Sequence, residues 1–175
     1  MPPEVFDVLR PWSRLRGGGR ETLLPETAWL AAISRRFDLE SLDRLVVDLT
    51  YDAWMDGARV RGRIEADAGR LCGVSLEPFV ERVEAELDLR FVPEGSPNAP
   101  SPEVELVVDL DADDPPEVAP VEGVDLAPYI VEAVGLALNP FPRAPGAVFA
   151  HVDRPSDTSP FSVLSRLSTG SDGDS

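Results

Sequence analysis

Apolar and polar residues alternate with a period of two along most of the first half of the chain. Three runs carry apolar residues at alternate positions: Leu45, Val47, Leu49 and Tyr51, then Val60, Ile64 and Ala66, then Val83, Ala85, Leu87, Leu89 and Phe91. The positions between them are mostly charged or polar. This pattern is typical of antiparallel strands that turn one face to the core and the other to water. It predicts an antiparallel meander with one wet face.

Turn signals separate the strands of this meander. Asp56 and Gly57 lie between the first two runs and predict a type I′ hairpin, because both central residues of that turn have a positive φ. Residues 67–69 predict a second break, after which residues 71–76 form a further strand. The expected meander therefore has four strands.

One segment before the strands has helical periodicity. Trp29, Ile33 and Phe37 recur at four-residue spacing, which places them on one face of a helix. Pro25 precedes them and suits the first turn of a helix, where its missing N–H has no partner to lose. These residues predict an amphipathic helix over residues 25–36.

A second helix is expected over residues 126–138. Asp125 precedes this segment as a capping residue, and Asn139 and Pro140 stop it. Apart from Glu132, the segment is apolar on nearly every side. A helix that is apolar all round is normally buried, so we expect this one to be the central buried helix.

The predicted fold class is α+β, in which a strongly twisted or partly closed antiparallel meander packs against the apolar helix, with the amphipathic helix beside it. Residues 93–124 are rich in proline and acids, and are interpreted as a flexible acidic loop with one strand at 104–110. Residues 144–175 are expected to form a loose tail. No internal repeat is visible, so residues 1–175 are expected to form a single domain.

Charge adds a strong bias to this picture. The chain has 16 basic residues, all of them arginine, and 32 acidic residues, for a net charge of −16. Residues 1–70 carry 11 arginines and 12 acids, whereas residues 71–175 carry 5 arginines and 20 acids. Repulsion from phosphates argues against a protein that coats nucleic acid, and an acidic surface attracts basic partners. A local arginine patch in the first half stays open as an alternative.

The expected compartment is a reducing cytoplasm. Cys72 is the single cysteine, so no disulfide forms within the chain. The first twenty residues lack the apolar core of a signal peptide, and no apolar run approaches the roughly 20 residues that a membrane helix needs. We therefore expect no membrane partner.

Motifs for catalysis or metal binding are lacking. His151 is the only histidine and lies in the polar tail without a catalytic motif nearby, and no phosphate-binding or dinucleotide-binding loop is present. The acidic run at 109–113 imitates the start of a calcium loop, but Asp114 stands where that loop needs glycine and Pro120 where it needs glutamate. We expect no catalytic residue, no metal, no cofactor and no small-molecule substrate.

Candidate partner-binding residues are Arg59, Arg61 and Arg63, which form a row on one face of the second strand, and Arg70, which follows them. A row of guanidinium groups on one strand face could contact an RNA backbone. The acids Glu84, Glu86 and Asp88 of the fourth strand could instead lie in the same sheet and pair with these arginines, as opposite charges across strands ordinarily do. The sequence leaves both interpretations open and leans towards pairing.

Asp125 and Glu132 complete the candidate set. A carboxylate within an apolar helix costs free energy unless it is hydrogen-bonded or faces water. Glu132 could therefore line a partner site. The alternative, which we favour, is that it occupies the one exposed stripe of its helix and pairs with an arginine.

Three segments together resemble the bacterial large-ribosomal-RNA-subunit accumulation protein (YceD) family, in the family's order and at comparable spacing. They are LCGVSLEPF at 71–79, GVDLAPYIVEAVGLALNP at 123–140 and SPFSVLSRL at 159–167. The first is similar to a Cys-x-x-Cys segment that leads into a strand. The second is similar to a helix with a leading aspartate, an internal glutamate and a terminal proline. The helix expected at 25–36 is also similar to the first helix of some members.

The resemblance implies a cytoplasmic, non-enzymatic factor that supports the synthesis, processing or stability of 23S rRNA. It leaves open whether the arginines of the first half bind rRNA or the acidic half holds a basic ribosomal protein. It also maps the family's Cys-x-x-Cys onto Cys72 and Ser75, and one cysteine cannot supply the four ligands of structural zinc. Cys72 is expected to be a small buried apolar residue.

Alternative functions are a metal-assisted nuclease acting on rRNA and an acidic adaptor unrelated to ribosomes.

Overall fold

The computed structural model describes residues 8–100 and 114–149 of the chain. Their elements are β1 (Leu9–Arg10), α1 (Trp12–Arg16), β2 (Gly19–Leu23), α2 (Thr27–Arg36), β3 (Ser41–Trp54), β4 (Gly57–Leu71), β5 (Pro78–Pro93), β6 (Glu117–Ala119), β7 (Val124–Asp125) and α3 (Ala127–Ala137). The strand expected at 104–110, the acidic run at 109–113, His151 and the family-like segment at 159–167 lie outside the described residues.

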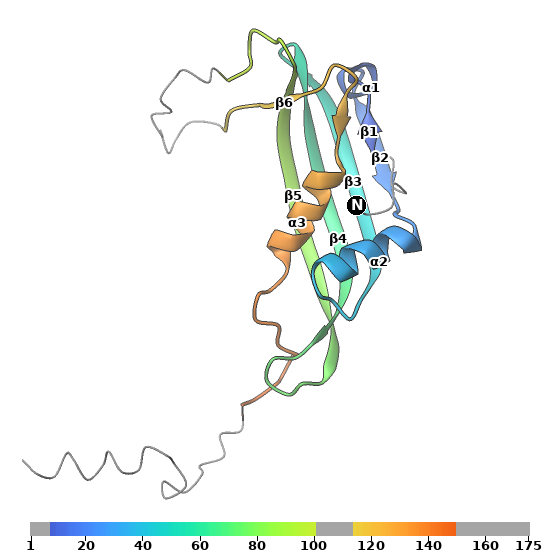
Figure 1. Cartoon of the computed structure of the whole chain (residues 1–175), viewed down its shortest axis with the longest axis vertical. Coiled ribbons are helices and arrows are strands. Elements are labelled where there is room, and N and C mark those ends of the chain that lie inside the picture. Colours follow the sequence, from blue (N-terminus) through green and yellow to red (C-terminus); the bar gives the residue numbers. More distant parts are fainter. Residues whose placement is uncertain (1–7, 101–113, 150–175) are drawn as a thin grey trace, which may run out of the picture.

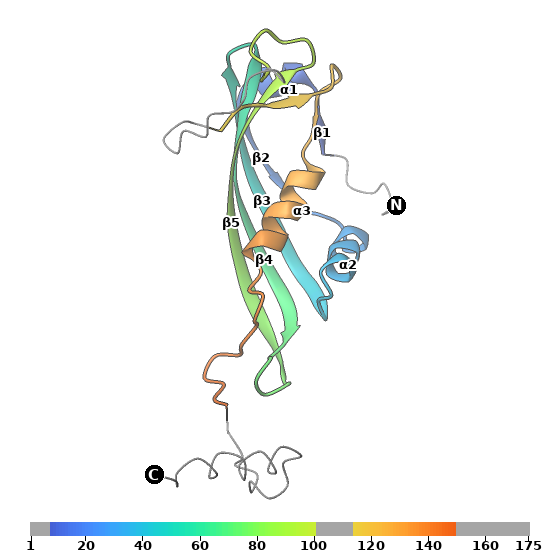
Figure 2. The ribbon, with the colours of Figure 1, turned by 60° about the vertical axis from the view of Figure 1, so that its left-hand side comes forward.

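Five strands form one sheet in the order β2-β3-β4-β5-β6. Neighbours are antiparallel except β5 and β6, which pair in parallel, and β1 and β7 form a separate two-stranded sheet. Figures 1 and 2 show the long, twisted β3, β4 and β5, with α2 and α3 against one face. The predicted α+β class is confirmed, with a sheet that is open and not closed.

The predicted strand faces are confirmed at most of their positions. Val47, Tyr51, Val60, Ile64 and Phe91 are fully buried beneath the helices. The intervening positions on β3, β4 and β5 carry the charged residues of the outer face. Alternation in sequence predicted these faces because successive side chains of a strand point to opposite sides.

The predicted hairpin between the first two strands is confirmed, but its turn lies one residue earlier than expected. Trp54 pairs with Gly57, so Met55 and Asp56 form the turn, and Met55 has a φ of 51°. Gly57 has another role. A Cβ at this position would overlap the carbonyl oxygen of Phe91 and lie 2.8 Å from its carbonyl carbon. Close approach of β4 and β5 therefore explains this glycine.

The prediction of a separate strand at 71–76 was wrong. Residues 67–69 are part of β4, where Gly69 pairs with both Ser41 and Val80. Residues 72–77 form the loop between β4 and β5, closed by a 2.9 Å hydrogen bond from the Leu76 N–H to the Cys72 carbonyl. Gly69 resembles a turn signal in the sequence, but here it makes room for the Ser41 side chain.

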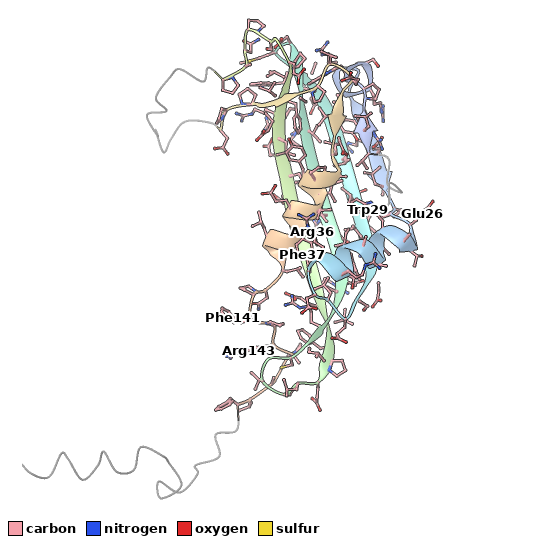
Figure 3. All side chains as sticks on the ribbon, viewed as in Figure 1. Glu26, Trp29, Arg36, Phe37, Phe141 and Arg143 are labelled. Carbon is pink, nitrogen blue, oxygen red and sulfur yellow. The ribbon has the colours of Figure 1, made fainter. Side chains whose placement is uncertain are left out.

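The amphipathic helix is confirmed as α2, which buries Trp29 and Ile33 against β3. Figure 3 shows Trp29 and Phe37 on this helix. Phe37 lies at the helix end nearest α3, where a Cβ on Gly135 would come within 2.6 Å of its ring. The two helices therefore touch at this point and cover the sheet side by side.

The expected central buried helix is α3, and its burial is confined to the face that packs on the sheet. α3 packs on β5 and buries Ile130 and Val134, but Leu136 is 80% exposed. The sequence could not show that the sheet ends beside α3 at β5, which leaves one flank of the helix without a neighbouring strand or helix among the described residues.

Residues 93–124 contain more structure than the predicted loop. β6 pairs in parallel with the end of β5, and β7 pairs with β1 just before α3. The Trp12 Nε1–H donates to the Pro120 carbonyl at 2.9 Å, which ties the β6–β7 connection to α1.

Among the described residues, no helix has both the length and the apolar character that crossing a lipid bilayer requires.

Candidate functional site

The arginine row on β4 is paired with acids of neighbouring positions. Arg59 donates from Nε to Asp88 at 2.6 Å, and this hydrogen bond lowers the pKa of that carboxyl. Arg61 contacts Asp52 on β3 at 2.6 Å, and Arg63 contacts Glu84 on β5 at 3.0 Å. Cross-strand pairing is confirmed for Arg59 and Arg63 with Asp88 and Glu84, whereas Arg61 pairs with Asp52 on β3 and not with one of the expected acids. Their guanidinium groups already have carboxylate partners that a phosphate would have to displace.

Arg70 belongs to a different and less exposed contact. It forms a 3.0 Å ion pair with Glu81, and the two side chains are 14% and 15% exposed. Both also hold the backbone of Asn139: Arg70 donates to its carbonyl at 3.2 Å, and Glu81 accepts from its N–H at 2.9 Å. Arg70 thus fastens the end of α3 to β4 and β5.

Cys72 is fully buried, as predicted, but it lies in the loop between β4 and β5 and its sulfur accepts hydrogen bonds. Its Sγ accepts hydrogen bonds of 3.4 Å from the N–H groups of Val74 and Ser75. Hydrogen bonds from the Ser75 side chain and from nearby backbone N–H groups lower the pKa of the thiol to about 6. Within residues 8–100 and 114–149, no three His, Cys, Asp or Glu side chains gather where they could hold a metal ion.

Replacing Ser75 by alanine should raise the pKa of the Cys72 thiol from its value of about 6, because the first of the donors to Sγ is lost. Ultraviolet absorbance of the thiolate, followed through a pH titration of the native protein, measures this shift. Ser41→Ala is the control, because Ser41 lies on β3 and pairs with Gly69 instead. An unchanged titration in Ser75→Ala would show that the side chain does not stabilise the thiolate.

Asp125 supports the start of α3. It pairs with Leu9 in the small sheet, and its Oδ1 accepts a 3.0 Å hydrogen bond from the Ala127 N–H. This contact satisfies one of the N–H groups that a helix start leaves without a partner. The predicted capping role is therefore confirmed, although Leu126 occupies the position directly before the helix.

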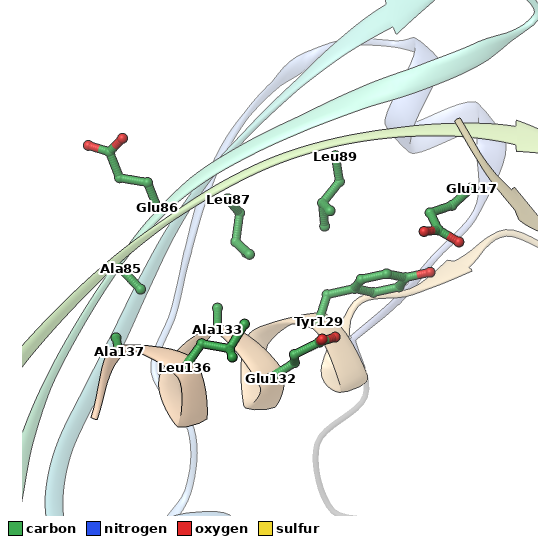
Figure 4. Close-up of a pocket in the computed structure, with 10 residues that line it drawn as sticks. All are labelled: Ala85, Glu86, Leu87, Leu89, Glu117, Tyr129, Glu132, Ala133, Leu136 and Ala137. Carbon is green, nitrogen blue, oxygen red and sulfur yellow. The ribbon is translucent and has the colours of Figure 1, made fainter. Parts of the chain in front are cut away.

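Glu132 lies on the exposed flank of α3 and, with Leu136, borders a groove of about 530 Å³ between that helix and β5. The other lining residues are Ala85, Glu86, Leu87, Leu89, Glu117, Tyr129, Ala133 and Ala137. Figure 4 shows Leu87 and Leu89 pointing from β5 towards the helix, and Glu86 pointing away from it. We call this feature the β5–α3 groove.

Negative charge dominates the rim of the β5–α3 groove. Tyr129 packs edge-on against Phe91 with ring centroids 5.1 Å apart. Burial raises the pKa of the Tyr129 hydroxyl, and the charges of Glu117, Glu132 and Asp125 raise it further. No arginine lines the groove, and within the described part of the chain neither Glu117 nor Glu132 forms an ion pair. The expected arginine partner of Glu132 is not found there.

The same groove runs along an unpaired strand edge. β6 pairs with β5 only at Phe91, Val92 and Pro93. Over residues 78–89, which we call the open edge of β5, no described strand lies on the side away from β4. An edge of this kind presents unpaired N–H and C=O groups to whatever adjoins it.

A second polar cluster lies at the opposite end of the strand order, at β2. Glu21 accepts hydrogen bonds from the hydroxyl of fully buried Tyr51 at 2.7 Å and from Arg10 Nε at 2.8 Å. Arg14 lies 3.6 Å from the same carboxylate and over the Tyr51 ring. Each of these polar side chains has a partner. The role of the cluster is therefore structural: it attaches Arg10 and Arg14 to β2 and β3 of the sheet.

The sequence pointed to Glu132 but missed the rest of the groove. Glu117, Tyr129 and Leu136 belong to segments interpreted as a loop or as a buried helix, and only the neighbouring strand edge makes them a site. Leu136 was the available signal, because it lies on the flank of α3 that Glu132 marks as exposed.

Comparisons of the chain with family models, with curated proteins and with solved structures gave no match.

Proposed function

We propose that this chain is a non-enzymatic factor in ribosome biogenesis, which supports the synthesis, processing or stability of 23S rRNA by holding a basic ribosomal protein. The observation that carries the choice of partner is the distribution of paired and unpaired charge. Arg59, Arg61 and Arg63 are paired with acids, whereas Glu117 and Glu132 line the groove and form no ion pair with another described residue. Of these two surfaces, the one with unpaired charge is therefore the acidic groove.

Long-range electrostatics support the same choice. A net charge of −16 slows the approach of a polyanion and speeds that of a polycation. Contacts to RNA phosphates would require the β4 arginines to exchange carboxylates for phosphates, with little net gain in charge pairing. A basic protein would meet the carboxylates of Glu117 and Glu132, which have no ion-pair partner in the described part of the chain, so charge complementarity favours it.

The resemblance to the YceD family supports the ribosomal context. Segment 123–140, which carries much of that resemblance, includes α3 and therefore one wall of the β5–α3 groove. Segment 71–79 forms the connection from β4 to the start of the open edge of β5. The proposed location is the cytoplasm, where ribosomes are assembled.

Affinity purification of the tagged chain from its native cells tests this function. We expect proteins of the large ribosomal subunit to co-purify at low salt and to stay bound after ribonuclease treatment, because the proposed contact is with protein. Recovery that disappears with ribonuclease would favour direct rRNA binding instead. Recovery of proteins unrelated to ribosomes would favour the adaptor alternative, and cleavage of RNA that EDTA abolishes would favour a nuclease.

The triple variant Arg59→Ala, Arg61→Ala, Arg63→Ala is expected to leave any affinity for 23S rRNA fragments unchanged. These arginines are 34%, 52% and 58% exposed, so losing each ion pair should cost less than about 1 kcal/mol of stability. Salt titrations of RNA binding measure the first effect and urea unfolding the second.

A matched control for this variant is Arg20→Ala, Arg35→Ala, Arg143→Ala, which removes the same charge from exposed positions elsewhere. RNA binding that weakens with salt, and weakens further only in the β4 variant, would contradict the proposed partner and restore phosphate contact through this strand.

A further inference from the structure

We propose that the β5–α3 groove binds an extended basic segment of the protein partner, which adds to the open edge of β5 as a further strand of the sheet. This inference rests on the proposed function, since it names the surface that would hold the basic protein. It commits to a segment in which apolar residues alternate with arginine or lysine. Three features of the groove carry it.

The first feature is the strand edge itself. The open edge comprises residues 78–89 of a 16-residue strand, and it spans roughly 40 Å at the rise of an extended chain. Residues 83–89 belong to its alternating part, whose inner side chains face α3. A strand added here would pair its main chain with β5, as in other cases of peptide recognition at sheet edges.

The second feature is the apolar lining on the inner side of that edge. Leu87 and Leu89 from the sheet face Ala133 and Leu136 from α3 across the groove (Figure 4). Leu136 is 80% exposed in the chain alone. Every second side chain of an added strand would enter this space, so apolar residues at alternate positions of the partner would cover Leu136 and widen the core.

The third feature is charge on both sides of the edge. Glu117 and Glu132 flank Tyr129 on the inner side, and Glu86 points to the outer side (Figure 4). A guanidinium group suits the inner position, because it can pair with a carboxylate and stack on an aromatic ring. An added strand with basic residues between its apolar ones would meet carboxylates on either face. RNA would bring phosphates to these acids and is disfavoured.

A synthetic peptide of alternating leucine and arginine, about ten residues long, tests the site on the full-length protein. We expect it to bind with an affinity that falls as salt rises. The control peptide has the same composition with its leucines and arginines in two blocks, which keeps the charge and removes the alternation. Equal binding of both peptides would reduce the interaction to general charge attraction and overturn the proposal.

Two N-methylated forms of the alternating peptide test strand addition directly. One carries methyl groups on the odd-numbered amides and the other on the even-numbered amides. In a strand paired on one edge, only one of these sets points its N–H groups at β5. We expect one form to bind at least about tenfold more weakly and the other to bind nearly as well as the parent. Equal behaviour of the two forms would exclude pairing with the edge.

The variant Glu117→Gln, Glu132→Gln should weaken binding of the alternating peptide about tenfold and flatten its salt dependence, because two rim carboxylates are neutralised. Its control is Glu40→Gln, Glu77→Gln, which neutralises two exposed acids outside the groove lining. A larger loss of peptide affinity in the Glu117→Gln, Glu132→Gln variant than in the control supports the site. Equal losses in the two variants overturn it.

Failure of the site and failure of the proposed function give different results. If ribosomal proteins co-purify equally well with the Glu117→Gln, Glu132→Gln variant, the function stands and the groove is not where the partner binds. If the alternating peptide binds as expected but no ribosomal protein co-purifies, the groove binds basic strands and the ribosomal partner is wrong.

Discussion

Gly57→Ala is expected to lower the free energy of unfolding by roughly 3 kcal/mol, because the new methyl group has no room in a well-packed sheet. Its Cβ would overlap the carbonyl oxygen of Phe91 and lie 3.0 Å from the Val92 Cα. Both obstacles are main-chain atoms, so no side-chain rotation can relieve the overlap. β4 and β5 would have to move apart where Ala58 pairs with the fully buried Phe91.

Urea unfolding of the purified variants measures this effect. Gly73→Ala is the control, because its Cβ would meet only the Pro142 carbonyl oxygen, at an ordinary 3.4 Å. We expect that control to stay within about 0.5 kcal/mol of the parent chain. Similar unfolding free energies for Gly57→Ala and Gly73→Ala would contradict the explanation of Gly57 by close packing.

Glu21→Ala is expected to lower the free energy of unfolding by about 2–3 kcal/mol. The loss removes the acceptor of the Tyr51 hydroxyl, which is fully buried, and the partner of Arg10, whose side chain is 17% exposed. Leaving buried donors without an acceptor costs more than the original hydrogen bonds contribute. Urea unfolding of Glu21→Ala, Tyr51→Phe and the double variant measures the effect. Costs that simply add would show that the two groups are not coupled.

The same cluster should make stability depend on pH. Burial raises the pKa of Glu21, but hydrogen bonds from Tyr51 and Arg10 and the charges of Arg10 and Arg14 outweigh it, so this pKa lies below its ordinary value of 4.5. The ionised carboxylate therefore stabilises the fold fully above pH 4.5, and this contribution is lost as the pH falls through the lowered pKa.

Urea unfolding of the parent chain and of Glu21→Gln over an acid pH series checks the direction of this pH dependence. The stability difference between them should shrink as the pH falls, since the glutamine side chain of the variant cannot titrate. Glu77→Gln is the control, because Glu77 is exposed in the loop between β4 and β5. A difference that stays constant in acid would mean that Glu21 is not held ionised by its partners.

Much of the fold was predictable because local sequence patterns report on burial. Tyr51, Ile64 and Phe91 were expected on the inner face of their strands and are fully buried there. Trp29 and Ile33 were expected on the inner face of a helix and lie there in α2. In each case the geometry of the strand or helix sets the period, and the period shows which side chains face the core.

The errors arose where distant segments meet. Gly57 and Gly69 resemble turn residues in the sequence, but both are small because another strand approaches closely. Leu136 resembles a core residue, but it lies beside the edge at which the sheet ends. The local sequence around these positions does not show which strand will lie next to them in the folded chain.

The sequence by itself determined most of the strand and helix faces and the acidic balance, and it favoured pairing of the β4 arginines with acids without deciding it. Only the tertiary structure decided the strand order, the open edge of β5, and the gathering of Glu117, Glu132 and Leu136 into one groove. The physical reason is that periodicity is a property of one segment and its own backbone. A groove is a property of segments that meet only when the chain has folded.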